Sequence, residues 1–281
     1  LKAWLTTYAG TYYLAKNFDV EVHQYGNEPD GYLRDQPDEE IALRFQLVSD
    51  AVHCAIEDVN QAFAKSLRAQ FAAPVLAGSP MSRIARVMMR SLRTDYHGRE
   101  MTRDLVQYFN RHRYGDRARQ NVLEVERTKQ MMLEESATGQ MIPQIFTELN
   151  YSTGGNWARP HITTTSDSPQ VIHSLASIWG QMTAVQGVQG IFLFKWAAEN
   201  IKWSNTVCYK FVRESDERSA AAASKGGPIT DIGYVTKNAE IVRMFGEGFS
   251  NAQDLLETRL RCTDPHYQAY TTYNPRESSY Y

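Results

Sequence analysis

Two glutamates stand where a folded chain would place reactive carboxylates, each at the end of a stretch that predicts a β-strand. Glu28 follows a strand-like run that starts at Val20, and it lies in the turn Gly26-Asn27-Glu28-Pro29. Glu148 lies in Thr147-Glu148-Leu149-Asn150-Tyr151, at the end of a later apolar run. Carboxylates at the C-terminal ends of parallel strands can meet at one edge of a sheet, where one acts as a nucleophile and the other transfers protons.

Each glutamate also has a plainer interpretation. A glutamate after a strand is often the first residue of a helix, where the helix dipole favours a negative charge, and this interpretation fits Glu28. Glu148 is equally typical of a solvated loop carboxylate.

Amides, aromatic residues and one histidine near the expected strand ends are candidates for binding a ligand. They are Asn27, His112, Tyr114, Asn150, Trp157 and Trp196. His112 lies in a run with two arginines, which is also typical of a polar loop or of a salt-bridge partner. Trp196 ends an apolar strand and suits a core equally well, and Trp157 follows a glycine-rich segment that is typical of an ordinary surface turn.

Helical and strand-like patterns alternate along the first 200 residues. The expected helices cover residues 1–16, 38–68, 82–93, 117–136 and 169–188, and the expected strands cover residues 19–25, 72–78, 105–109, 142–149 and 190–196. Such alternation predicts an α/β fold with a parallel sheet and helices outside it. A doubly wound sheet also alternates, but no Gly-x-Gly-x-x-Gly follows an early strand. Polar clusters after every strand favour a (β/α)8 barrel, which builds its active site at that end.

The composition is that of an ordinary globular protein. The 281 residues are 42% hydrophobic and 22% charged, with a net charge of -2, so no electrostatic reason exists to expect nucleic acid or an acidic membrane as a partner. No apolar run approaches the roughly 18 residues that predict a membrane span. Cys54, Cys208 and Cys262 are too widely spaced for a metal cluster and leave one disulfide or none.

Taken together, these residues resemble the clan A retaining glycoside hydrolases, which are (β/α)8 TIM barrels. Gly-Asn-Glu-Pro at residues 26–29 is similar to the acid/base motif that ends the fourth strand of that clan, and Thr147-Glu148 is similar to the nucleophile that ends the seventh. His112-x-Tyr114 is similar to residues of the sixth strand that line the cleft. Phe194-Lys195-Trp196 resembles the end of the eighth strand, where an aromatic residue forms the base of a sugar-binding subsite. The resemblance covers residues 1–200.

The resemblance implies a retaining hydrolase that cleaves β-glycosidic bonds in a polysaccharide by double displacement. Glu28 would be the acid/base and Glu148 the nucleophile, with Asn27 on the sugar 2-hydroxyl and no cofactor or metal. The 120 residues between positions 28 and 148 accommodate three strand–helix units of about 40 residues, which brings strands four and seven to face each other. A retaining mechanism needs the two carboxyl groups roughly 5–5.5 Å apart. Hydrogen bonds from neighbours such as Tyr114 would keep the nucleophile ionised.

The chain begins at what resembles the third helix of such a barrel, so the expected fold is the C-terminal five-strand portion, without strands one to three. An incomplete barrel has open edges, and we therefore expect an upstream part of the same protein or a partner chain to complete it. The expected organisation is a catalytic barrel portion over residues 1–200. A loop, a short helix and a small β module would follow over residues 201–281.

Within the clan, residues 163–169, the Gly-Ile-Phe-Leu-Phe-Lys strand and Lys237-Asn238-Ala239-Glu240 resemble agarase- and porphyranase-like enzymes of glycoside hydrolase family 86. This resemblance implies a secreted or extracellular enzyme acting on an algal galactan; the motif at residues 26–30 also resembles the heparanase-like and family 39 groups. One alternative is a non-catalytic extracellular structural or glycan-binding protein on a hydrolase-like barrel. Another, a barrel that pairs carboxylates with a metal, is disfavoured because no convergent ligand set is predicted.

Overall fold

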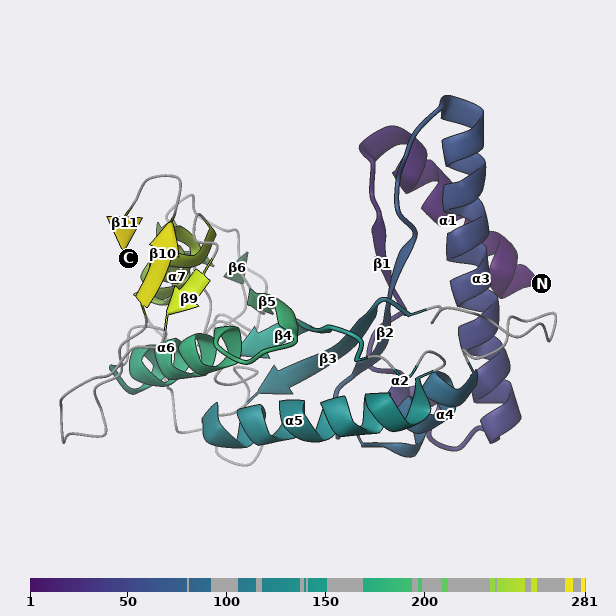
Figure 1. Cartoon of the computed structure of the whole chain (residues 1–281). Coiled ribbons are helices and arrows are strands. Elements are labelled where there is room, and N and C mark those ends of the chain that lie inside the picture. The colour runs from purple at the N-terminus through teal and green to yellow at the C-terminus, as the bar shows by residue number, and fades with distance from the viewer. Residues whose placement is uncertain are drawn as a thin grey trace. The chain divides into compact units, whose positions relative to one another are not determined.

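The structure is a computed structural model of the chain (Figure 1), and part of the chain is described here. The described residues are 1–79, 81–91, 106–114, 118–136, 139, 141–150, 169–193, 197–198, 209–211, 233–235, 237–250, 254–256, 271–274 and 279–280.

The chain divides into two compact units. The first comprises Leu1–Arg113, Leu123–Thr147 and Gly187–Ile191, and the second comprises Tyr114–Val122, Glu148–Gln186 and Phe192–Tyr281.

Strands and helices alternate from the N-terminus, as the sequence predicts. The helices are α1 (Lys2–Phe18), α2 (Pro29–Tyr32), α3 (Asp38–Phe63), α4 (Arg83–Ser91), α5 (Ala118–Glu135) and α6 (Pro169–Thr183). The strands are β1 (Val22–Gln24), β2 (Gln70–Leu76), β3 (Tyr108–Tyr114), β4 (Gln144–Asn150) and β5 (Val188–Leu193). They form one parallel sheet in the order β1-β2-β3-β4-β5, which is consistent with part of a (β/α) barrel.

Helix α1 packs along α3 (Figure 1). The contact is made by aromatic side chains that recur on one face of α1. The rings of Trp4 and Tyr8 stack with centroids 5.1 Å apart. The Trp4 indole donates a hydrogen bond to Asp50 at 2.7 Å, and the Tyr8 hydroxyl donates one to Asp58 at 2.5 Å. Stacked aromatic residues of α1 thus attach it to α3 through hydrogen bonds to acidic side chains.

The core of the first unit lies around β2, which is buried along almost its whole length. Phe71 and Leu76 of β2 are fully buried, as are Phe45 of α3 and Met88 of α4. Both faces of the strand are therefore covered, as expected for a strand inside a parallel α/β sheet. This packing fixes the C-terminal end of β2, against which the turn carrying Glu28 lies.

Strand β3 differs from its predicted position by several residues, because His112 and Tyr114 lie within the strand and not after it. Its middle residues are polar but buried, with Asn110 and Arg111 both 0% exposed. Arg111 lies 2.9 Å from a carboxylate oxygen of Glu124 and 5.0 Å from the ring centre of Phe146. Burial lowers the pKa of Arg111 to about 10. The polar composition of this segment suggests a loop, but contacts with these partners offset the free-energy cost of burying polar side chains in a strand.

Strand β4 lies close to its predicted bounds: residues 142–149 are predicted and Gln144–Asn150 are observed, so Glu148 lies within the strand as predicted and Asn150 is its last residue. Leu149 and Asn150, the last two residues of β4, are buried, whereas Glu148 is half-buried. Thr147 and Glu148 are thus the two less buried residues of a strand whose other residues are buried.

The second unit contains two small sheets and the helices α6 and α7 among its described residues. β6 (Ala197–Ala198), β7 (Tyr209–Phe211) and β8 (Gly233–Val235) form one sheet, and β9 (Asp254–Leu256), β10 (Thr271–Asn274) and β11 (Ser279–Tyr280) form the other. Helix α7 (Lys237–Ser250) lies where a short helix is predicted and contacts α6, with the rings of Trp179 and Phe245 6.4 Å apart. The division at residue 200 remains a prediction.

Within the part of the chain described here, the helices are all too short or too polar to cross a membrane. Cys54 of α3 is a thiol, and Cys208 and Cys262 lie outside the described residues.

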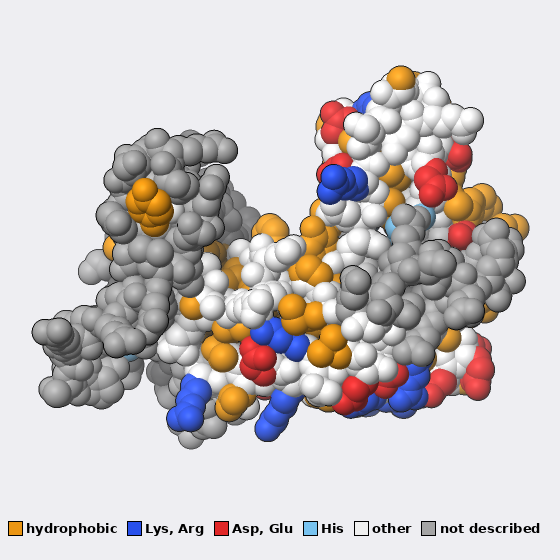
Figure 2. Space-filling model, in the orientation of Figure 1, with side chains coloured by type: hydrophobic (Ala, Val, Ile, Leu, Met, Phe, Trp, Pro, Cys, Tyr) orange, Lys and Arg blue, Asp and Glu red, His pale blue; other side chains and the backbone are white. Residues whose placement is uncertain are grey.

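Charged side chains of both signs gather over α4 and α5 (Figure 2), and one ion cluster there is partly buried. Both carboxylate oxygens of Glu135 accept hydrogen bonds from Arg90, at 2.6 and 2.8 Å, and one also accepts from Arg86 at 3.2 Å. The Arg90 guanidinium is the main reason that the pKa of Glu135 falls below its ordinary value of 4.5. Because the pKa of Glu135 is lower in the folded than in the unfolded protein, its ionised carboxylate stabilises the folded state at pH values above the unfolded pKa. This stabilisation disappears as the pH falls through the folded pKa.

We therefore expect Glu135→Gln to lower the free energy of unfolding by about 1 kcal/mol at pH 7, which is less than the roughly 1.5–3 kcal/mol of a hydrogen bond to a charged group because the Arg90 partner is exposed to solvent. The difference from the native protein should shrink steadily below about pH 4.5, where the native carboxylate also becomes protonated. Thermal unfolding followed by circular dichroism from pH 7 to about pH 3 measures this. Glu134→Gln, at the more exposed neighbouring position, is the control; an equal effect of both variants would contradict the assignment.

Candidate active site

Glu28 lies in a turn whose backbone is held in an unusual conformation. Its φ of 46° and ψ of 56° are left-handed, and it immediately precedes α2, which begins at the buried Pro29. The left-handed conformation costs an L-residue other than glycine roughly 1–2 kcal/mol. The Glu28 N–H donates to the carbonyl oxygen of Val75 at 3.1 Å, and Val75 is itself left-handed with a φ of 60°. Strained residues of this kind persist where the surrounding structure holds them, and they gather at functional sites.

The Glu28 carboxylate lies against a buried histidine of β3. Nδ1 of His112 is 2.9 Å from Oε1 of Glu28. The His112 side chain is 1% exposed, whereas the Glu28 side chain is 41% exposed. The imidazole therefore fixes one oxygen of a carboxylate whose other face remains accessible to solvent or to a ligand.

Glu148 has a hydrogen-bond donor of its own in the second unit. The Tyr114 hydroxyl, from the last residue of β3, donates to Oε2 of Glu148 at 2.5 Å. Both side chains are half-buried. The phenol therefore fixes the orientation of one oxygen of this carboxylate.

Asn110, two residues before His112 in β3, links three strands of the first unit. Its side-chain amide donates to Gln24 of β1 at 3.3 Å, and its oxygen accepts from the backbone and the hydroxyl of Thr147 in β4 at 3.3 and 3.0 Å. Asn110 thereby helps to hold the register of β3 against β1 and β4. His112 lies two residues further along β3, and Glu148 directly follows Thr147 in β4.

The other predicted site residues are distributed as follows. Asn27 is exposed in the turn before Glu28, and Asn150 is 1% exposed at the end of β4. Trp157 and Trp196 lie outside the described residues, together with Phe194 and Lys195. Asp30, the next residue after Pro29, is not a predicted site residue, yet its carboxylate accepts two backbone hydrogen bonds from the segment after β2.

The chemistry available to these pairs is proton transfer and nucleophilic attack by oxygen. A carboxyl group beside an imidazole can give up a proton and take one back, and a carboxylate held by a phenol can attack an electrophilic carbon.

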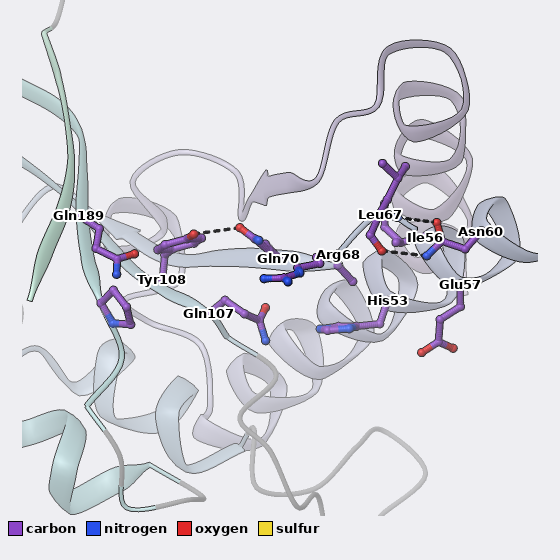
Figure 3. Close-up of a pocket in the computed structure, with 12 residues that line it drawn as sticks. His53, Ile56, Glu57, Asn60, Leu67, Arg68, Gln70, Gln107, Tyr108 and Gln189 are labelled. Atoms are coloured by element: carbon purple, nitrogen blue, oxygen red, sulfur yellow. Dashed lines mark hydrogen bonds between the residues drawn. The ribbon is translucent and has the colours of Figure 1, made fainter. Parts of the chain in front are cut away.

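The first unit also has a cavity of about 590 Å³, shown in Figure 3, at the other end of the strands. It is lined by side chains from the second half of α3, including His53, Glu57 and Asn60, and by the first residues of strands, including Gln70 and Tyr108. Several of its polar groups already bond to their neighbours: Tyr108 donates to Gln70 at 2.9 Å, and Asn60 bonds the backbone of Leu67 through both its amide nitrogen and its oxygen. Among the predicted site residues that the structure describes, none lines this cavity. In barrels the N-terminal ends of the strands serve stability more than catalysis.

The sequence matches no family profile and no curated protein. Similar solved structures do exist. One is a bacterial orthologue of human α-L-iduronidase, with a TM-score of 0.58 and 13% identity over 86% of this chain and 40% of that chain. Another is a glucosidase from Croceicoccus marinus, with a TM-score of 0.48 and 11% identity over 68% and 38% of the two chains. A third is a GH2 β-galacturonidase from Eisenbergiella tayi, with a TM-score of 0.47 and 10% identity over 88% and 36%.

The chain thus spans about 40% or less of the length of these structures. All three are glycoside hydrolases. The fold likeness rests on the iduronidase orthologue, whose TM-score alone exceeds 0.5 among the three, and it agrees with a parallel sheet that forms part of a (β/α) barrel.

Proposed function

We propose that this chain is the catalytic barrel portion of a retaining glycoside hydrolase, with Glu28 as the acid/base and Glu148 as the nucleophile. The observation that carries the proposal is that β3 supplies a partner to each glutamate, His112 to Glu28 and Tyr114 to Glu148. Residues two apart in a strand point to the same face. His112 and Tyr114 both come from the C-terminal end of β3, and barrels place their catalytic groups at the C-terminal ends of their strands.

In the first step, Glu148 attacks the anomeric carbon while Glu28 gives its proton to the leaving glycosidic oxygen. The bond from the carbon to that oxygen breaks, and a glycosyl ester with Glu148 forms. In the second step, Glu28 takes a proton from water, whose oxygen attacks the same carbon and releases Glu148 as a carboxylate. Two inversions give net retention. His112 positions Glu28, and the Tyr114 hydroxyl holds Glu148 for attack and stabilises it again as the leaving group.

The remaining site residues have proposed roles in binding. Asn27 precedes Glu28 and would reach the sugar 2-hydroxyl, where hydrogen bonds strengthen in the transition state. Asn150, Trp157 and Trp196 would complete the substrate cleft, the tryptophans as flat apolar surfaces for sugar rings. The resemblance to agarase- and porphyranase-like enzymes makes a β-linked algal galactan the first substrate to test, and such a substrate would be met outside the cell. The fold likeness to an iduronidase orthologue provides a precedent for a glycosidase on this architecture.

Glu28, His112 and Glu148 are also of the residue types that bind divalent metals. We favour acid–base chemistry because these groups already bond to protein: the His112 Nδ1 faces the Glu28 carboxylate, and the Glu148 carboxylate accepts from Tyr114. Hydrolysis should accordingly be unchanged by EDTA.

A completed barrel wall is part of the proposal. Strand β1 is at one end of the sheet order, and Val22 in it is 46% exposed. On the neighbouring helix α1, large apolar side chains are exposed at Leu5, Tyr13 and Phe18. Exposed apolar side chains beside an unpaired strand edge are expected where another element covers the edge. We propose that further strand–helix units, from an upstream part of the same protein or from a partner chain, pack against this edge.

The test is a product assay with the purified protein on agar, porphyran, β-glucans and uronic-acid polymers. New reducing ends and a first-formed product of unchanged anomeric configuration, read by proton NMR, are expected. An inverted product would contradict double displacement. Binding to a polysaccharide in affinity electrophoresis without any cleavage would instead support the non-catalytic glycan-binding alternative.

A further inference from the structure

We propose that Asp30 is a positioning residue, which holds Glu28 in its reactive orientation by fastening the Glu28 turn to the end of β2. The proposal rests on the acid/base role proposed above for Glu28. Asp30 itself is two residues from Glu28 and contacts backbone groups, so its effect on a reaction would be exerted through Glu28.

The Asp30 carboxylate bridges segments that are far apart in the sequence. Oδ1 accepts a hydrogen bond from the backbone N–H of Ala77 at 3.0 Å, and Oδ2 accepts one from the N–H of Gly78 at 2.7 Å. Two successive N–H groups on the two oxygens of one carboxylate make charge-assisted bonds that fix direction as well as distance. Helix α2 is thereby attached to the chain just after the buried strand β2.

Glu28 needs such an attachment because its backbone conformation is strained. Its left-handed φ of 46° is held on one side by the bond from its N–H to Val75. On the other side, Asp30 holds the first turn of α2 against Ala77 and Gly78. The segment from Val75 to Gly78 therefore supports Glu28 at both ends. Releasing either end would let the backbone relax toward right-handed values and swing the carboxylate away from His112.

Gly78 fits this role by its lack of a side chain. A Cβ added at Gly78 would lie 2.9 Å from Oδ2 of Asp30, closer than a Cβ normally approaches another atom. A larger residue at this position would displace the Asp30 carboxylate from the backbone N–H groups, whereas glycine permits its close approach. Asp30 and Gly78 form a matched pair, and changing either should loosen the same contact.

The first experiment compares Asp30→Asn with Asp35→Asn, a control at a more exposed aspartate of the same connection. The Asp30 amide would retain one acceptor oxygen but point its NH2 group at a backbone N–H, so one bond is lost without a change in size. We expect kcat to fall roughly 10- to 100-fold with KM changed less than about threefold, because a small misplacement of a catalytic group acts on the chemical step. Gly78→Ala should act in the same direction, and Asp35→Asn should stay within about twofold of the native enzyme.

A double-mutant cycle separates positioning from a general loss of structure. If Asp30 acts through Glu28, adding Asp30→Asn to Glu28→Gln should not lower the residual hydrolysis of an activated aryl glycoside any further. A further multiplicative fall would overturn the proposal. Should Glu28→Gln itself keep full activity, the acid/base role of Glu28 fails, and the spectroscopic measurement below decides on Asp30 alone.

The second measurement needs no activity. In protein labelled with 15N-histidine, the Nδ1 signal of His112 reports its contact with the Glu28 carboxylate. Asp30→Asn and Gly78→Ala should shift this signal toward that of Glu28→Gln, while Asp35→Asn leaves it unchanged. Variants that are folded by circular dichroism and keep the native His112 signal would overturn the proposal, whatever their activity.

Discussion

Glu148→Gln should lower kcat/KM for polysaccharide hydrolysis by roughly 10⁴-fold or more, the scale found when a nucleophile is removed from an enzyme. The amide has the size of the carboxylate but lacks the negative charge needed to attack the anomeric carbon. Its oxygen can still accept the hydrogen bond from Tyr114, so the end of β4 should keep its structure. The loss would thus be chemical, with a melting temperature close to that of the native protein.

The measurement is steady-state kinetics on the substrate found in the product assay, together with thermal unfolding of each variant. Glu126→Gln, at an exposed glutamate of α5 that pairs with Lys129, is the matched control and should keep its activity within about twofold. Tyr114→Phe should be intermediate, losing roughly 10- to 100-fold, since a hydrogen bond to a charged group contributes about 1.5–3 kcal/mol. Full activity in purified Glu148→Gln would remove Glu148 from the mechanism.

The sequence predicts the order of elements well because apolar periodicity records burial. Runs such as the one around Phe71 and Leu76 are buried on both faces and cannot be mistaken for loops. Strand β3 is harder to place. Asn110, Arg111 and His112 are polar residues that become buried only because Thr147, Glu124 and Glu28 provide partners from distant parts of the chain. No local pattern encodes those partners, and the predicted strand therefore ended too early.

The candidate site shows the same limit. Glu28 and Glu148 are recognisable because a carboxylate at a strand end next to an amide or a proline is a local signal. The role of Asp30 is invisible in the sequence, since its hydrogen-bond donors are 47 and 48 residues away and belong to the backbone. An aspartate in the first turn of a helix is usually explained by the helix dipole, and Gly78 by a turn. Only the contact between them shows that each requires the other.

Glu28→Ala should reduce polysaccharide hydrolysis by roughly 10²- to 10⁴-fold, the contribution of a general acid and base. An aryl glycoside with a good leaving group should suffer far less in the first step, because its oxygen departs without a proton. The second step then becomes rate-limiting, since no base remains to activate water, and the glycosyl ester of Glu148 should accumulate. Mass spectrometry of the variant after brief exposure to this substrate would detect the added sugar.

Azide distinguishes the two glutamates by the stereochemistry of its product. In Glu28→Ala, azide needs no base and attacks the glycosyl ester from the side that water would use, which breaks the bond to Glu148 and gives a glycosyl azide of retained configuration. In Glu148→Ala, azide can enter only from the face of the missing nucleophile, so a single displacement gives the inverted azide. We expect rescue of Glu28→Ala by at least about tenfold and no rescue of the native enzyme. A failure of azide to accelerate deglycosylation in Glu28→Ala would argue against Glu28 as the base, and exchanged stereochemical outcomes would reverse the two assignments.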